Sequence, residues 1–153
     1  MKPVSFVVPG QPIGKGRPRI GKVGNHARMF TPAKTASYEN LIAIAAQQAM
    51  AGRELILGPV LVELEIILQI PQSWSKKRKQ LALDGRVYPT TKPDKDNVIK
   101  AIYDGINGIV WKDDVQAVDG HQRKRYGATP GVKVRVVPLE DADSENYSVK
   151  GAA

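Results

Sequence analysis

The chain has no cysteine and only two histidines, and these absences exclude several common kinds of active site. Without cysteine there is no disulfide framework, no Cys-based metal site and no thiol nucleophile. His26 and His121 lie far apart in the sequence, which argues against a metal role for either. No Ser-His-Asp set supports nucleophilic catalysis by a hydroxyl. A metal site in this chain is therefore expected to use oxygen ligands.

Long hydrophobic runs are also missing. No segment could span a bilayer, and the apolar run in MKPVSFVVPGQP is far too short for a signal peptide. A length of 153 residues suits about one domain with a modest core. We therefore expect a cytosolic protein without a membrane partner, built as one domain over residues 1–140 and a flexible acidic tail over residues 141–153.

Acidic residues are absent before Glu39, although the chain as a whole has 23 Lys and Arg against 15 Asp and Glu, a net charge of +8. This excess indicates an anionic partner. Residues 10–32 show neither helical nor strand periodicity and predict a long, flexible, glycine-rich loop. A solvated loop is one interpretation; the other is that its cations contact phosphates, namely Lys15, Arg17, Arg19, Lys22 and Arg28.

Further basic clusters leave the same two interpretations open, a solvated face or a nucleic-acid contact. They are Lys76 and Lys77, in a short helix that Ser73 would cap, and Arg123 and Lys124, in a later strand. The aromatic residues near these clusters, Trp74 and Tyr88, are not assigned to a nucleic acid or a protein partner by the sequence. Trp111 is expected in the core or in the wall of a site.

Alternating and helical patterns predict an α+β domain with two main helices and a small mixed or antiparallel sheet. Val62, Leu64, Ile66, Leu68 and Ile70 share one face of the clearest strand. The expected order is a strand over 4–8, a helix between Thr31-Pro32 and Gly52, the strand over 62–70, the short basic helix, a helix over 95–107, and strands over 115–126 and 132–137 that form a hairpin around GATPG.

The stretch KPDKDNVIK, residues 92–100, places two acids among lysines at the start of the second main helix. Asp94 suits the N-cap position, where its oxygen would accept from a free backbone amide. Asp96, Lys100 and Asp104 then follow at i, i+4 spacing. Capping alone does not account for Asp96, since neighbouring carboxylates repel unless a cation lies between them. A surface ladder of ion pairs is one explanation of the row, but a second acidic cluster further along the chain argues against it.

A second acidic pair, Asp113 and Asp114, follows the helix where the chain turns back towards the sheet. A tight return would bring one of these acids near the start of the helix. Clustered carboxylates suit Mg²⁺ or Mn²⁺. An EF-hand is excluded, because Val98 and Ile99 would occupy positions five and six and Gly105 position twelve. Acids, a nearby lysine and basic loops together predict metal-dependent phosphodiester hydrolysis.

The segment DKDNVIKAIYDGINGIVWKDDVQAVD resembles the core motif of the RusA family of Holliday-junction resolvases, which are frequent in phages and prophages. The motif positions are Asp94, Asp96, Asn97, Lys100, Asp104, Trp111, Asp113 and Asp114. The early GKGRPRIGK is similar to the opening of phage members, so the resemblance covers roughly residues 3–137.

The resemblance implies a homodimer that cleaves four-way DNA junctions with Mg²⁺, for which Mn²⁺ substitutes, in the cytoplasm of a bacterial host. By position, Asp94, Asp96 and Asp114 would be metal ligands, with Asp113 as a further candidate, and Lys100 the catalytic lysine. No small-molecule cofactor is implied. Two alternatives stay open: a nuclease for other branched DNA, and a non-catalytic DNA-binding accessory protein whose acids only cap and pair.

Overall fold

The structure, a computed structural model, describes residues 2–16, 19–23, 26–30 and 33–141, and the side chains of 2–16 and 35–141. The predicted tail therefore lies almost wholly outside the described residues. The elements are β1 (Val4–Pro9), β2 (Arg19–Val23), β3 (His26–Phe30), α1 (Ala33–Met50), β4 (Val60–Gln69), α2 (Lys76–Leu83), α3 (Lys95–Ile106), the 3-10 turn η1 (Asp114–Gln116), β5 (Ala117–Gly127) and β6 (Gly131–Pro138). The α+β class is confirmed.

The strand with the strictest alternation, β4, lies inside a four-stranded sheet of order β1-β6-β4-β5. It is antiparallel to β6 and parallel to β5, so the sheet is mixed. Its apolar face is buried from Val60 through Leu68, and Glu63 and Glu65 lie on the other face, as the alternation predicts. A strand with neighbours on both sides satisfies all its backbone groups, which suits the most apolar strand of the chain.

The predicted hairpin between the last two strands is wrong. Both strands exist, but β5 and β6 each pair with β4, which lies between them. Gly127 pairs with Gln69 and Gly131 with Ile67, so residues 128–130 pass the end of β4. Two strand spacings are about 10 Å, a distance that three residues can span. A short connection therefore did not require the two strands to be neighbours.

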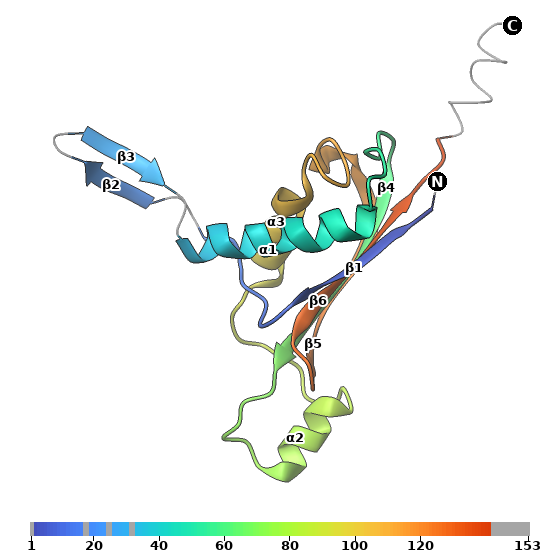
Figure 1. The fold of residues 1–153 in the computed structure, drawn as a ribbon. Helices are drawn as coiled ribbons and strands as arrows, with labels where there is room; N and C mark the ends of the chain where they lie inside the picture. Colours follow the sequence, from blue (N-terminus) through green and yellow to red (C-terminus); the bar gives the residue numbers. More distant parts are fainter. Residues whose placement is uncertain (1, 17–18, 24–25, 31–32, 142–153) are drawn as a thin grey trace, which may run out of the picture.

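The prediction of a flexible loop over residues 10–32 is also wrong in part, because β2 and β3 form an antiparallel hairpin with Ile20 opposite Met29. The strands are joined by Gly24-Asn25, a dipeptide that favours two-residue hairpin turns. The periodicity of the sequence does not reveal the hairpin, because its two strands contain little apolar alternation. Figure 1 shows this hairpin standing apart from the four-stranded sheet, next to the start of α1.

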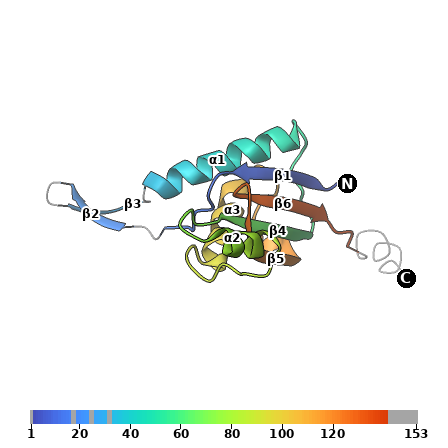
Figure 2. The same ribbon diagram turned by 90° about the horizontal axis from the view of Figure 1, so that it is seen from below.

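Helices α1 and α3 cover one face of the four-stranded sheet and pack against each other (Figures 1 and 2). The predicted stripe of α3 is confirmed, since Val98, Ile102 and Ile106 are fully buried. Gly105 belongs to the same stripe and lies against Ile42 of α1. The opposite side of α3 is left for polar residues. Among the described residues, no helix is long and apolar enough to cross a bilayer.

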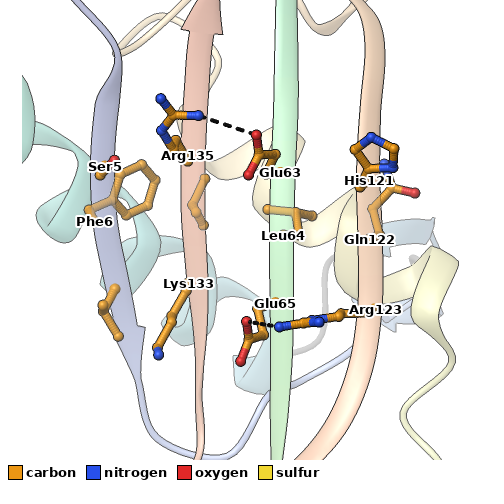
Figure 3. Close-up of a pocket in the computed structure, with 12 residues that line it drawn as sticks. Ser5, Phe6, Glu63, Leu64, Glu65, His121, Gln122, Arg123, Lys133 and Arg135 are labelled. Carbon is orange, nitrogen blue, oxygen red and sulfur yellow. Dashed lines mark hydrogen bonds and ion pairs between the residues drawn. The ribbon is translucent and has the colours of Figure 1, made fainter.

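No helix of the described part of the chain covers the other face of the sheet (Figures 1 and 2), and we call it the open face. Figure 3 shows its charged side chains in cross-strand pairs: Arg135 binds Glu63 at 3.2 Å, and Arg123 binds Glu65 at 2.8 Å. Together with apolar neighbours such as Val7, they line a shallow hollow of about 850 Å³. The sheet therefore presents a mixed apolar and charged surface opposite its helices.

The short basic helix is present as α2, but its cap is Ser75 rather than Ser73. The Ser75 hydroxyl accepts from the backbone N–H of Arg78 at 3.2 Å. Ahead of the helix, Trp74 makes an edge-to-face contact with Tyr126 of β5, at 5.2 Å between ring centroids, and the Arg78 guanidinium lies 4.1 Å above the Trp74 ring. These contacts attach α2 to the end of β5, away from α1 (Figure 1).

The close approach of α1 and α3 at Gly105 gives a first test. A Cβ at this position would lie 2.7 Å from Cγ2 of Ile42, so Gly105→Ala should cost roughly 1–3 kcal/mol by overpacking, more than the roughly 1 kcal/mol that alanine adds in helix propensity. Urea unfolding should show a net loss of stability. In an Ile42→Ala background the cost should fall but not vanish, because Cγ2 is removed while Cβ of residue 42 stays 2.9 Å from the added methyl group. Stabilisation in the otherwise native chain would contradict the packing.

Candidate active site

The first turn of α3 begins at an acid that caps it. Asp94 is the N-cap with extended backbone angles, φ −65° and ψ 137°, and its Oδ1 accepts from the backbone N–H of Asp96 at 2.8 Å. The capping role predicted for Asp94 is therefore confirmed. This hydrogen bond uses Oδ1 alone, so the cap does not require Oδ2 of Asp94.

Asp94 and Asp96 line one depression of about 610 Å³ at the start of α3. Its remaining lining residues are Thr90, Thr91, Lys92, Lys95, Asn97 and Lys124. The Lys124 ammonium reaches across from β5 and donates to the carbonyl oxygen of Thr91 at 2.8 Å, which fixes the loop before the helix to the sheet. Two exposed carboxylates thus share a pocket with three lysines.

One helical turn further along, Lys100 lies between two other acids. Its Nζ is 3.3 Å from Oδ1 of Asp104 and 4.0 Å from Oδ2 of Asp114. The predicted row of Asp96, Lys100 and Asp104 is present on α3, so the Cα atom of Asp96 is about 6 Å along the helix axis from that of Lys100. The depression that contains Asp94 and Asp96 therefore lies next to Lys100 and its two acids along one side of the helix.

The return of the chain from α3 to β5 depends on residues whose roles the sequence did not reveal. The fully buried Trp111 donates its indole N–H to Oδ1 of Asn107 at 2.6 Å, and its carbonyl accepts from the backbone N–H of Gly108 at 2.8 Å. Gly108 has φ +77°, a value that favours glycine. The expectation that Trp111 belongs to the core or the site wall is confirmed.

Gln116 completes this return. Its side-chain carbonyl accepts from the backbone N–H groups of Lys112 and Asp113 at 2.9 and 3.0 Å, and its amide donates to the carbonyls of Ile56 and Gly58 at 2.7 and 2.9 Å. A glutamine that uses both ends in this way holds the acidic turn against the segment before β4. Asp114 is consequently held beside Lys100.

Electrostatic strain is concentrated at Asp114. Partial burial raises the pKa of its carboxyl, the neighbouring carboxyls of Asp113 and Asp104 raise it further, and Lys100 partly offsets them. Burial followed by the charge of Asp114 also raises the pKa of Tyr103. Burial, first, and the neighbouring carboxyls, second, therefore disfavour the charged form of Asp114 in the folded chain.

The donor set fits a hard divalent cation. Mg²⁺ commonly uses one or two protein carboxylates and completes its octahedron with waters and phosphate oxygens, and Asp94 and Asp96 offer such a pair in one depression. Asp114 is placed with Lys100 and Asp113 instead. Within the described residues no group of three or more His, Asp or Glu side chains is arranged to hold a metal ion, so the assignment of Asp94, Asp96 and Asp114 as ligands stays a prediction.

The predicted DNA-binding cations fall into different surroundings. Lys76 and Lys77 are exposed on the first turn of α2. Adjacent strand residues point to opposite faces, so Lys124 joins the acidic depression while Arg123 pairs with Glu65 on the open face. Arg17 lies outside the described residues, and the side chains of the hairpin residues Arg19, Lys22 and Arg28 are likewise outside the described set. His121 is exposed on the open face.

Lys15 differs from the other predicted cations whose side chains are described, because it forms ion pairs with two acids, one on α1 and one on α3. Its Nζ is 2.8 Å from Oε1 of Glu39 and 2.7 Å from Oδ2 of Asp104. Burial lowers the pKa of Lys15, but the hydrogen bonds and charges of Asp104 and Glu39 outweigh it, and the net shift is upwards. This ion pair links acids that are far apart in the sequence.

The strain at Asp114 predicts that its charge destabilises the metal-free fold. A carboxyl whose folded pKa is raised contributes stability below its unfolded pKa and loses that contribution as the pH rises through the folded value. At neutral pH in EDTA, Asp114→Asn should therefore raise the thermal midpoint by up to a few degrees, since about 1 kcal/mol corresponds to roughly 2–4 °C in a chain of this size.

The gain from Asp114→Asn should disappear near pH 3, where the native carboxyl is protonated. Glu54→Gln, at an exposed acid outside this cluster, provides the control and should leave the midpoint nearly unchanged. A lower midpoint for Asp114→Asn at neutral pH would contradict the assignment of strain.

Two comparisons with known proteins agree with this geometry. The family model for Endodeoxyribonuclease RusA matches residues 9–137. A protein of Bacillus subtilis (strain 168) named "Uncharacterized protein YqaN" is 36% identical over 135 residues, which are 87% of this chain and 94% of the relative. The residues matched by the family model include α3, the acidic turn, β4, β5 and most of β6. The chain belongs to the RusA endodeoxyribonuclease family.

Proposed function

We propose that the protein is a divalent-metal-dependent endonuclease that resolves four-way DNA junctions by hydrolysing paired phosphodiester bonds. The observation that carries the proposal is the shared depression of Asp94 and Asp96, one helical turn from Lys100. Membership of an endodeoxyribonuclease family supports the nuclease activity itself. The choice of substrate and ion goes beyond that family membership.

Asp94 and Asp96 are the residues proposed to hold Mg²⁺, or Mn²⁺ in its place, and Asp114 with its neighbour Asp113 is proposed to complete the acidic set. A bound ion of this kind activates a water molecule and neutralises charge on a phosphate. Three lysines line the same depression and would attract the phosphodiester into it, namely Lys92, Lys95 and Lys124.

Lys100 is proposed to stabilise the charge that develops on the phosphate in the transition state. Its side chain is 59% exposed, so a phosphate can reach it, and Asp104 and Asp114 hold the ammonium in place. A cation positioned in advance loses less free energy to reorganisation during the reaction. The two acids therefore act on the lysine by orienting it.

DNA binding is proposed to rest on phosphate contacts around this depression. Lys76 and Lys77 on α2 and Lys124 on β5 are candidates from the described side chains, and the basic residues of the β2–β3 hairpin are candidates from the sequence. Phosphate contacts supply affinity that depends strongly on salt but carries no sequence information. Arg123 is a weaker candidate because Glu65 already neutralises it.

The proposed metal site predicts that Asp96→Asn abolishes cleavage and preserves binding. Losing one group that stabilises transition-state charge typically costs about 10²–10³-fold in rate, whereas removing a negative charge should leave DNA affinity equal or tighter. Cleavage of a synthetic four-way junction with Mg²⁺ should be compared with binding in EDTA.

Glu54→Gln is the matched control for Asp96→Asn and should cleave normally. Equal cleavage of flaps, forks and junctions by the native protein would favour the broader branched-DNA nuclease. Undiminished cleavage by Asp96→Asn would remove that acid from the metal site. A native protein that binds junctions but cuts no DNA with Mg²⁺ or Mn²⁺ would favour an accessory role.

A homodimer is proposed because a two-fold enzyme can cut two symmetry-related strands of a junction. The open face is the surface proposed for the second copy. Its acids and bases are paired across neighbouring strands, Glu65 with Arg123 and Glu63 with Arg135, so the face buries little unpaired charge against a two-fold related copy. Two sheets commonly pack face to face about 10 Å apart.

The proposed dimer predicts a solution mass of about twice 16.7 kDa by light scattering at micromolar concentration. Val7→Glu should shift the protein towards monomer, because Val7 is 54% exposed and lies in the hollow of the open face. Leu57→Glu, at an apolar residue that is 73% exposed outside this hollow, should stay dimeric. A monomeric native protein would exclude the dimer, and a dimeric Val7→Glu protein would exclude this interface.

A further inference from the structure

The segment before the hairpin is fixed between the two main helices. The backbone N–H of Lys15 donates to the carbonyl of Asn97 at 2.9 Å, and that of Gly16 donates to Oγ1 of the buried Thr35 at 2.9 Å. A Cβ at Gly14 would lie 3.0 Å from Cβ of Asn97, so the segment touches the first turn of α3. Ile13 packs against the core from the same segment.

The Lys15 side chain continues this attachment into the acidic cluster. It spans from Glu39 on α1 to Asp104 on α3, at 2.8 and 2.7 Å, and its side chain is only 26% exposed. Asp104 then uses its other oxygen, Oδ1, for Lys100 at 3.3 Å. One carboxylate is therefore shared between Lys15 and Lys100.

This sharing affects how Lys100 is held. Lys100 is 3.3 Å from Asp104 but 4.0 Å from Asp114, so its ammonium lies between two competing acids. Without the Lys15 charge, both oxygens of Asp104 would be available to Lys100 and would attract it more strongly along α3. The ammonium would then move away from Asp114, and more of its charge would be neutralised by Asp104.

We propose that Lys15 is a positioning residue that orients Lys100 through Asp104, and that it does not contact DNA. The inference rests on the proposed catalytic role of Lys100. The basic composition of the segment predicted a phosphate contact for Lys15. Such a contact would require Lys15 to break its ion pairs with Glu39 and Asp104. Lys15 thereby links the base of the hairpin to the proposed catalytic lysine.

The first experiment separates positioning from DNA contact. Lys15→Gln removes the charge, Lys15→Arg retains it, and Lys76→Gln removes an exposed cation from α2 as the control. We expect Lys15→Gln to slow single-turnover cleavage at saturating junction and Mg²⁺ by about tenfold or more, while junction binding in EDTA keeps its affinity and its dependence on salt. Lys15→Arg should recover most of the rate.

Lys76→Gln should instead weaken junction binding and make it less dependent on salt. Losing one phosphate contact reduces the magnitude of the slope of log K against log salt by about 0.9. A Lys15→Gln protein with a flatter slope and a native saturated rate would identify Lys15 as a DNA contact and overturn the proposal. A Lys15→Gln protein that is native in both measurements would overturn it as well.

The route through Asp104 has its own test. If Lys15 acts through this acid, adding Lys15→Gln to Asp104→Asn should slow cleavage no further than Asp104→Asn alone. Independent, multiplicative losses would contradict the route. Glu39→Gln leaves the Lys15–Asp104 pair intact and should cleave close to the native rate. Native junction binding by Lys15→Gln itself checks that a slow protein is not merely misfolded.

A readout without activity separates this inference from the proposed function. In the metal-free protein, the carboxyl carbon resonance of Asp104 and the Nζ resonance of Lys100 should shift in Lys15→Gln and return towards native values in Lys15→Arg. Unshifted resonances would overturn the proposed ion-pair chain. If the native protein cleaves no DNA, the proposed function fails, but these resonances still decide whether Lys15 positions Lys100.

Discussion

The burial of one side of α3 determines which residues the helix presents on its other side, where the candidate site lies. Val98, Ile102 and Ile106 are fully buried beneath α1 and against the sheet, and Gly105 allows Ile42 to approach the helix backbone. Helical periodicity then places Asp96, Lys100 and Asp104 in one row outside the core. A rotation of α3 would expose apolar residues and bury charges, so the packing that stabilises the helix also fixes the direction of the candidate site.

The acidic cluster is held by contacts from several parts of the chain. Gln116 attaches the turn that carries Asp114, and Lys15 brings a cation from the segment before the hairpin. Even with Lys15 and Lys100 present, the pKa of Asp114 remains raised by burial and by nearby carboxyls. The fold therefore accepts a local loss of stability where the proposed cation and phosphate would bind, a pattern common at functional sites.

The two faces of the sheet have separate roles in the proposed enzyme. The helical side carries the acidic depression, and Lys124 reaches it from β5. The open face carries cross-strand ion pairs that include Arg123 (Figure 3). Because neighbouring strand residues alternate in direction, two adjacent basic residues contribute to different surfaces.

The sequence by itself determined the α+β class, the buried stripe of α3, the alternation of β4, the cap at Asp94 and the family. These follow from local periodicity, from short-range hydrogen bonding and from a motif with ordered spacings. Residues three or four apart on a helix must be neighbours, so the row from Asp96 to Asp104 was predictable without any tertiary information.

The tertiary structure alone decided which distant segments meet. Placing β4 between β5 and β6 depends on the burial of a whole strand, and a short connection does not reveal it. The engagement of Lys15 with Glu39 and Asp104 depends on the packing of α1 against α3, because the acids lie 24 and 89 positions further along the chain. A positive charge in a glycine-rich segment looks the same in a sequence whether it faces DNA or an acid of its own chain; only the fold distinguishes the two.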